Sequence, residues 1–276
     1  MKKQIWLAAA ALAAVTGGMM LAAPSASYGA AVTVQAGVSS SREYELRGPG
    51  AAKGGLAPET FPAVSFDVNQ FVLPQEARVL VAVEGTGGSS CRVSVYERLE
   101  EGWVQRLGTR GVMGANGMSN HRTEGDKTTP VGVFCMNTPF GQLDAQEGFP
   151  SNYIKVKESH VWSQITNRLV DDPSEEGERV GTAGYARFYD YVIDAGYNPL
   201  GLERKGSALF LHCIGQNESY TSGCVAIPTD QMIAVMRLYG TYGDGACYAA
   251  QAPEGTFDQI YQSYGVNQGL SPEGEF

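Results

Sequence analysis

Positive charge is scarce in this chain of 276 residues, where 20 Lys and Arg stand against 29 Asp and Glu and the formal net charge is -9. No cluster of Lys and Arg gathers in any segment. Binding to nucleic acid needs such clusters opposite the phosphates, so we expect no nucleic-acid partner. The excess of negative charge favours solubility and carries no information about the fold.

Histidine is also scarce, with 3 in the chain, and neither Cys-x-x-Cys nor His-x-x-x-His occurs. These spacings are typical of zinc sites, so their absence weakens a metalloprotein interpretation and we expect no metal and no cofactor. One zinc alternative stays open, with His212, Cys213 and Cys224 as three ligands. Adjacent strand residues such as His212 and Cys213 face opposite sides, which disfavours it.

Long apolar runs are missing except near the N-terminus, where residues 5–15 follow Lys2 and Lys3 and small residues occupy 22–27. This order is typical of a secretory signal peptide, which we place at residues 1–31. The folded part is then exported and either secreted or associated with the cell wall. The alternative is an uncleaved membrane tether, since a span needs roughly 20 apolar residues. No Cys follows the run, so we expect no lipoprotein anchor.

The five cysteines are an odd number for an exported chain, so two bridges would still leave one thiol for chemistry. They are Cys91, Cys135, Cys213, Cys224 and Cys247. The alternative is that none is bridged and most are small buried hydrophobic residues.

Composition divides the chain into three further parts. Residues 32–63 are rich in Gly, Ser and Pro and predict a flexible linker, because such a segment buries too little apolar surface to fold. Residues 64–250 predict one folded domain, and residues 251–276 a C-terminal extension. Short β-branched or alternating runs predict a mainly β fold with a few helices, of the α+β class. The predicted strands cover residues 78–83, 92–98, 103–107, 131–134, 187–193, 207–212 and 223–227.

One helix is predicted from the apolar spacing of residues 232–239. Thr229 or Asp230 provides the N-cap, and Gly240 is expected to end the helix. Its apolar stripe is interpreted as core packing.

Two residues form a candidate catalytic pair of nucleophile and base. His212 ends a predicted buried strand, and Cys224 begins the next one twelve residues later, after a polar, turn-rich loop. Adjacent strands lie about 5 Å apart, so the two side chains can meet at one end of the sheet. A neighbouring imidazole activates a thiol by removing its proton. Gly223 permits close backbone approach, and its N–H, beside Ser222, is a candidate oxyanion donor. By spacing alone, a core His and a buried Cys remain the alternative.

The residues around this pair carry a family resemblance. At 207–212 (Ser-Ala-Leu-Phe-Leu-His) and 221–226 (Thr-Ser-Gly-Cys-Val-Ala) the chain resembles the L,D-transpeptidase catalytic-domain (YkuD-like) family. Residues 124–134, with a Thr-Pro-x-Gly-x-Phe core, look like that family's stretch upstream of the site, and residues 114–117 fit as well. The resemblance covers roughly residues 78–239, most of the predicted domain.

The resemblance implies an L,D-transpeptidase-like β-sandwich or barrel domain and a cysteine acyltransferase that forms or exchanges cross-links between peptidoglycan stem peptides, its partners. It implies Cys224 as the nucleophile and His212 as the general base, then acid. Many members have Ser-His-Gly-Cys, whereas Ser222 precedes Gly223 here; many have Arg or Asn after the Cys, and this chain has neither. The His-to-Cys spacing is also shorter than the family's commonest pattern. These departures leave open the choice of substrate and an L,D-carboxypeptidase or hydrolase with the same site. A non-catalytic wall-binding module is a separate alternative.

Three other residues receive weaker predictions. Arg122 is interpreted as a solvated loop charge, with binding of a substrate carboxylate as the alternative. Cys213 is expected to point away from His212, with a disulfide to Cys224 as the alternative. His160 is interpreted as structural, and Glu124-Gly125-Asp126 as a turn.

Overall fold

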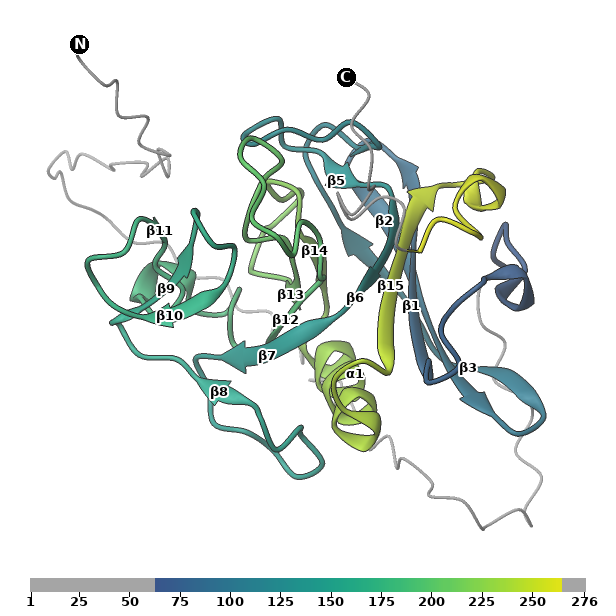
Figure 1. Cartoon of the computed structure of the whole chain (residues 1–276), viewed down its shortest axis with the longest axis horizontal. Coiled ribbons are helices and arrows are strands. Elements are labelled where there is room, and N and C mark those ends of the chain that lie inside the picture. Colours follow the sequence, from purple (N-terminus) through teal and green to yellow (C-terminus); the bar gives the residue numbers. More distant parts are fainter. Residues whose placement is uncertain (1–62, 265–276) are drawn as a thin grey trace, which may run out of the picture. The chain divides into compact units, whose positions relative to one another are not determined.

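A computed structural model describes residues 63–264. The predicted signal peptide, the linker up to residue 62 and residues 265–276 lie outside the described range. The described residues form a mainly β fold with one α-helix and three short 3-10 helices, which agrees with the predicted class. Ten strands build one mixed sheet in the order β6-β15-β1-β2-β3-β14-β13-β12-β7-β8 (Figure 1).

The elements follow in chain order: η1 (Val68–Gln70), β1 (Val79–Gly87), β2 (Ser90–Leu99), β3 (Gly102–Val112), β4 (Met118–Ser119), β5 (Thr129–Pro130), β6 (Gly132–Cys135), β7 (Asn137–Gly141), β8 (Ile154–Lys155), β9 (His160–Ser163), β10 (Leu169–Asp171), β11 (Gly177–Glu178), η2 (Ala183–Tyr185), β12 (Val192–Asp194), β13 (Phe210–Cys213), β14 (Val225–Ile227), α1 (Thr229–Tyr242), β15 (Cys247–Pro253) and η3 (Phe257–Gln259).

The strands predicted at residues 78–83, 92–98 and 103–107 are confirmed as β1, β2 and β3, which pair in sequence as an antiparallel meander. The alternation of side chains in β2 buries Val93 and Val95 on the face that packs on the main core. The ten-stranded sheet also contains parallel pairs, among them β15 with β1 and β14 with β13. The second parallel pair joins the predicted His strand to the predicted Cys strand.

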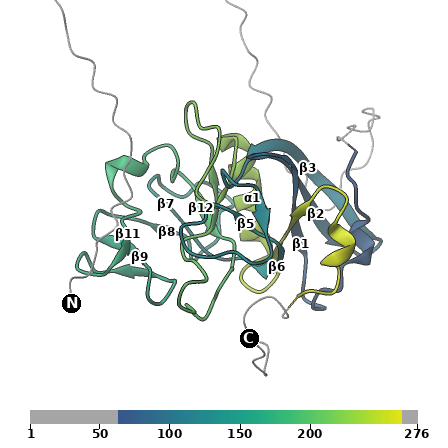
Figure 2. The same ribbon diagram turned by 90° about the horizontal axis from the view of Figure 1, so that it is seen from above.

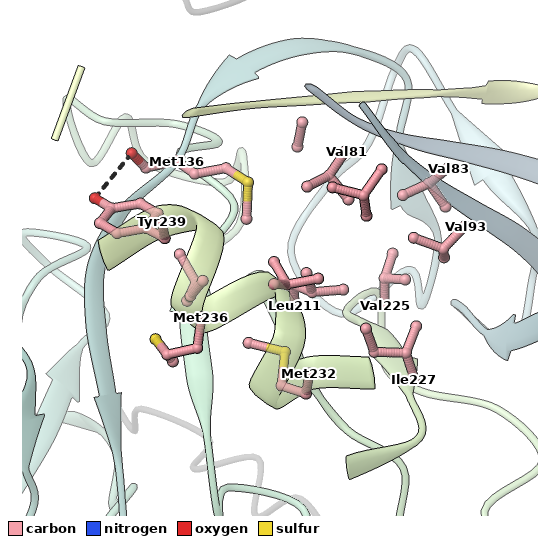
Figure 3. Close-up of a cluster of buried hydrophobic side chains, with 14 of the residues drawn as sticks. Val81, Val83, Val93, Met136, Leu211, Val225, Ile227, Met232, Met236 and Tyr239 are labelled. Carbon is pink, nitrogen blue, oxygen red and sulfur yellow. Dashed lines mark hydrogen bonds between the residues drawn. The ribbon is translucent and has the colours of Figure 1, made fainter. Parts of the chain in front are cut away.

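The main core lies between α1 and the sheet. Side chains from β1, β2, β13, β14 and β15 all contact this cluster, and Met232, Val235, Met236 and Tyr239 of α1 fill it (Figure 3). Tyr239 also donates its hydroxyl to the Met136 carbonyl at 3.4 Å. The apolar stripe of the helix is therefore core packing, as its spacing predicts.

The ends of α1 differ from the prediction. Pro228 occupies the N-cap position without a side-chain cap, and the helix runs through Gly240 to Tyr242. Gly243, at φ 78°, is the residue that ends it, with its N–H bonded to the Tyr239 carbonyl. Residue 240 is a glycine inside the helix because the backbone of Gly148 and Phe149 packs where a Cβ would stand. Close packing, and not termination, accounts for that glycine.

A second layer covers the opposite face of β12 and β13. Strands β9, β10 and β11 form a small separate sheet, which Figures 1 and 2 place beyond β7 and away from β1, β2 and β3. Trp162 of β9 packs edge-on against Phe210 of β13, with ring centroids 4.8 Å apart. This second cluster also contains Cys224 and Tyr189, so the predicted nucleophile lies on the face opposite α1.

Several predicted boundaries need correction. The two predicted strands at the site start later than expected, β13 at Phe210 instead of residue 207 and β14 at Val225 instead of residue 223, so Cys224 precedes its strand. Residues 187–191 are turns, and the strand begins at Val192. The domain does not end at residue 250, because β15 runs to Pro253 and Phe257 and Ile260 after it are buried in a third cluster with Leu80 and Tyr248. The apolar side chains of residues 257–260 pack against the outer face of β1 and β15, so this part of the predicted extension belongs to the fold.

Within residues 63–264, no helix has the length and apolarity needed to cross a membrane.

Candidate active site

His212 and Cys224 lie on neighbouring parallel strands. Leu211 pairs with Val225 and His212 with Ala226, so Cys224 lies beside Phe210, one step before the paired segment. Side chains of paired residues share a face, and residues two apart along a strand do also. His212, Phe210 and Cys224 therefore face the same side, toward the small sheet.

The Cys224 thiol is enclosed. Its Sγ accepts from the Phe210 N–H at 3.3 Å and donates to the Ala208 carbonyl at 3.3 Å, and the residue is 8% exposed. Burial raises the pKa of Cys224 to about 12, and the negative charge of Glu178 adds to this effect. The Phe210 N–H and the charge of Arg122 act in the opposite direction. Cys224 is therefore a protonated thiol at rest.

His212 is buried on the same face of the neighbouring strand, two residues along from Phe210. Burial lowers the pKa of His212 to about 4, against smaller raising contributions from the Cys213 and Phe188 backbones. Its Nδ1 lies 2.8 Å from the Cys213 carbonyl oxygen, and the ring of Tyr189 packs edge-on at 5.4 Å between centroids. Among the described residues His212 and Cys224 share no hydrogen bond. Both side chains are therefore neutral at rest.

The turn before Cys224 requires glycine. Gly223 has φ +136°, and a Cβ there would stand 2.7 Å from both Arg122 Nη1 and the Thr128 carbonyl oxygen. Its N–H donates to Thr221 Oγ1 at 3.0 Å, and that hydroxyl donates to the Cys224 carbonyl at 2.6 Å. The Gly223 N–H can therefore act as an oxyanion donor only if its hydrogen bond to Thr221 Oγ1 breaks. Ser222, beside it, is exposed.

The upstream segment meets this turn. Thr129 Oγ1 accepts from the Gly114 N–H and donates to the Gly223 carbonyl, both at 2.9 Å. Gly114 also forms a parallel β-bridge with Thr221. The two sequence segments that carry the family resemblance are thus joined through one buried hydroxyl, immediately before the candidate nucleophile.

Sequence reasoning missed an acidic and aromatic group at the site. Glu178, from β11, accepts a hydrogen bond from the Tyr189 hydroxyl. The rings of Tyr185 and Tyr189 stack with centroids 4.7 Å apart. Burial raises the pKa of Glu178 to about 7, against the lowering effect of its bonds to the two tyrosines. No sequence motif marks these residues, and only the folding of the small sheet of β9, β10 and β11 brings the charge of Glu178 near Cys224.

The interpretation of Arg122 as a solvated charge is wrong. The residue is 4% exposed, and its Nη1 bonds Asp126 Oδ1 at 3.2 Å and the Thr128 carbonyl. Asp126 in turn accepts from the N–H groups of Thr123 and Thr128, which confirms the predicted turn. His160 is buried in β9, where its Nδ1 accepts from the Lys157 N–H, a structural role.

The cysteines other than Cys224 lie elsewhere in the fold. Cys213 packs in the main core against α1, whereas Cys224 belongs to the cluster on the opposite face, so the alternative of a disulfide between them is wrong. All five cysteines are free thiols. Within residues 63–264 no group of three His, Cys, Asp or Glu side chains is arranged to hold a metal ion. The zinc alternative fails on geometry, because Cys213 packs in the main core and Cys224 on the opposite face.

Comparison with known proteins adds little to this geometry. No family model matches the chain, and no curated protein does. A solved structure of the Bdellovibrio bacteriovorus protein Bd1075 is similar at 14% identity and a TM-score of 0.33 over 63% of this chain. The aligned part spans 47% of that protein, about half of its length.

Proposed function

We propose that this chain is a cysteine acyltransferase that exchanges peptide bonds between peptidoglycan stem peptides, an L,D-transpeptidase in chemistry, and that it acts outside the cytoplasm. The residues support a nucleophile and base on one face of two adjacent strands, and the sequence resemblance supplies the substrate class. Cys224 is the proposed nucleophile and His212 the proposed base.

The observation that carries the proposal is the hydrogen bond from Thr129 to the Gly223 carbonyl. Thr129 begins the Thr-Pro-x-Gly-x-Phe segment. Gly223 lies 94 residues after Thr129 and directly precedes Cys224. Two short motifs that matched by chance would have no reason to meet at a glycine of positive φ next to a thiol. The contact supports reading both motifs as parts of one site.

The proposed chemistry starts from a neutral thiol and a neutral imidazole. The Cys224 sulfur attacks the carbonyl carbon of the donor peptide bond as its proton passes to the neutral His212. The carbon–sulfur bond forms, the carbon–nitrogen bond breaks, and the proton passes from His212 to the departing amine. An acceptor amine then attacks the thioester, loses its proton to His212 and restores the Cys224 thiol. Burial favours the neutral forms of both residues between turnovers.

Intact mass spectrometry after incubation with a carbapenem tests the nucleophile. Wild type should gain one adduct, Cys224→Ala none, and His212→Ala the same adduct more slowly. Cys135→Ala is the matched thiol control, because Cys135 is the most exposed of the five cysteines and lies outside the site. An adduct that survives in Cys224→Ala, or no adduct on reduced wild type, would contradict the proposal.

Product analysis with a donor stem peptide separates the two outcomes of the thioester. A cross-linked product that requires an added acceptor stem identifies transfer. Release of the terminal residue at the same rate with and without acceptor would identify hydrolysis. If the wild-type protein binds cell wall but catalyses neither transfer nor hydrolysis, the result would indicate a binding module instead.

A further inference from the structure

Two backbone groups hold the Cys224 thiol. Its Sγ accepts from the Phe210 N–H and donates to the Ala208 carbonyl, both at 3.3 Å. Phe210 is the first residue of β13 and pairs with Asp194 of β12, so the sheet itself fixes the Phe210 N–H. Ala208 precedes the strand, so the direction of its carbonyl depends on other contacts.

Ala208 has a backbone conformation that a residue with a Cβ rarely adopts. Its φ is +53°, in the left-handed region. Residues other than glycine persist there where the surrounding structure enforces the conformation, and such residues gather at functional sites. The Ala208 N–H donates to Asn167 Oδ1 at 3.1 Å, across 41 positions of the chain. This bond ties the peptide that carries the thiol's acceptor to the small sheet.

Asn167 is itself fixed at both ends of its carboxamide. It lies in the loop between β9 and β10, is 5% exposed and has φ +51°. Its Oδ1 also accepts from Trp162 Nε1 at 2.7 Å. Its Nδ2 donates to the carbonyls of Tyr197 and Asn198, both at 2.9 Å. The oxygen accepts two hydrogen bonds and the nitrogen donates two, so the buried carboxamide has a single orientation.

We propose that Asn167 is a positioning residue for the nucleophile, which fixes the Ala208 carbonyl as the acceptor of the Cys224 thiol and thereby the place and direction of the S–H group. Asn167 acts through Ala208. Before the proton can pass to His212, the S–H group has to turn away from the Ala208 carbonyl. The assignment rests on the proposed function in treating Cys224 as the nucleophile.

The S–H stretching band of Cys224 tests the assignment without a substrate. The band is obtained for the full chain as the infrared difference between each protein and the same protein carrying Cys224→Ala. In wild type it should lie at lower wavenumber than the band of ethanethiol in hexane, because the thiol donates to a carbonyl. Asn167→Gly permits the same positive φ and removes the carboxamide, so the band should shift toward the ethanethiol position.

Asn217→Gly is the matched control. Asn217 is an exposed asparagine at φ +62°, so this variant makes the same substitution in the same backbone region away from Ala208. It should leave the band of Cys224 unchanged.

Acylation by a carbapenem measures the consequence for the reaction. Asn167→Gly should form the Cys224 adduct at least about tenfold more slowly, because a small displacement of a reacting atom has a large effect on rate. Asn217→Gly should react as wild type does. Denaturant melts of both variants record stability separately. An Asn167→Gly protein of lower stability that keeps the wild-type band and acylation rate would overturn the assignment.

A wild-type band at the ethanethiol position would also overturn it, and this measurement stands if Asn167→Gly does not fold. Asn167→Asp is then the second variant, since it keeps an oxygen for the Ala208 N–H and should keep the band of wild type; a shift to the ethanethiol position would contradict the assignment. A carbapenem adduct on wild type with a free-thiol band would overturn this assignment alone. A hydrogen-bonded band that depends on Asn167, without any adduct, would overturn only the proposed function.

Discussion

Thr129 holds Gly223 in place, because its hydroxyl donates to the Gly223 carbonyl while it accepts from the Gly114 N–H, both at 2.9 Å. All three groups are buried, so the single hydroxyl satisfies one donor and one acceptor that water cannot reach. The position of the Cys224 thiol therefore depends on a residue that is remote in sequence.

Replacing Thr129 by Val keeps the shape of the side chain and removes the hydroxyl. We expect the free energy of unfolding to fall by about 2–4 kcal/mol, because a buried N–H and a buried carbonyl each lose a partner. Acylation of Cys224 should slow as the Gly223 turn loosens. Thr129→Ser is the control, since it retains the hydroxyl. Denaturant melts and adduct mass spectrometry measure the two effects, and equal stability of the two variants would contradict the account.

The reactivity of Cys224 should depend steeply on pH. Since the pKa of Cys224 is raised to about 12 and that of His212 is lowered to about 4, no thiolate–imidazolium pair exists at rest. The rate of alkylation by iodoacetamide should rise about tenfold per pH unit from 6 to 9, in proportion to the thiolate. Rates are measured by peptide mapping of Cys224. A plateau that begins below pH 7 would show a preformed ion pair and disprove this expectation.

Gly223→Ala should destabilise the protein through both strain and collision. The residue lies at φ +136°, and the added Cβ would meet Arg122 Nη1 and the Thr128 carbonyl oxygen at 2.7 Å. Gly102→Ala is the matched control, because Gly102 lies at φ +124° with nothing within 4 Å of a Cβ. We expect Gly102→Ala to cost about 1–2 kcal/mol and Gly223→Ala at least about 2 kcal/mol more. Similar losses in the two variants would remove the case for close packing at Gly223.

His212 should make the fold sensitive to acid. Its pKa falls from 6.5 to about 4 on burial, so between these values the unfolded chain binds more protons than the native protein. Its contribution to stability is complete above pH 6.5 and is lost as the pH falls toward 4, by on the order of 3 kcal/mol. His212→Gln should lack this component. The test is the difference in unfolding free energy between the two proteins from pH 4 to pH 8, and a difference that does not change with pH would contradict it.

Glu178 should suppress thiolate formation at Cys224. Its negative charge contributes to the raised pKa of Cys224, and burial brings its own pKa to about 7. Glu178→Gln should therefore accelerate alkylation of Cys224 at pH 8 by a few-fold, with little change at pH 5.5, where the wild-type carboxyl is already protonated. Glu176→Gln, an exposed acid on the same segment, is the control. A gain of the same size at both pH values would indicate loosened packing instead.

The local sequence was sufficient for β1, β2, β3 and the body of α1, because their own residues establish the periodicity. It did not predict β7, β9 or β15. The alternation at residues 92–98 became β2, and the stripe at 232–239 became the buried face of α1. His212 and Cys224 were proposed from the family resemblance of the residues around them, because by spacing alone a core His and a buried Cys remained the alternative. The end of α1 was missed because Gly240 is needed for packing against residues 148–150, which no local pattern reveals.

The surroundings of the pair were decided by tertiary structure. Arg122 reads in sequence as a charged loop residue, yet the fold buries it between Gly206 and Gly223. Glu178 has no distinguishing sequence context and reaches the site through the small sheet of β9, β10 and β11. Residue type and spacing fix which groups can react, because covalent chemistry and strand geometry are local. The charge, pKa and partners of those groups depend on burial, which arises only when segments far apart in the chain come together.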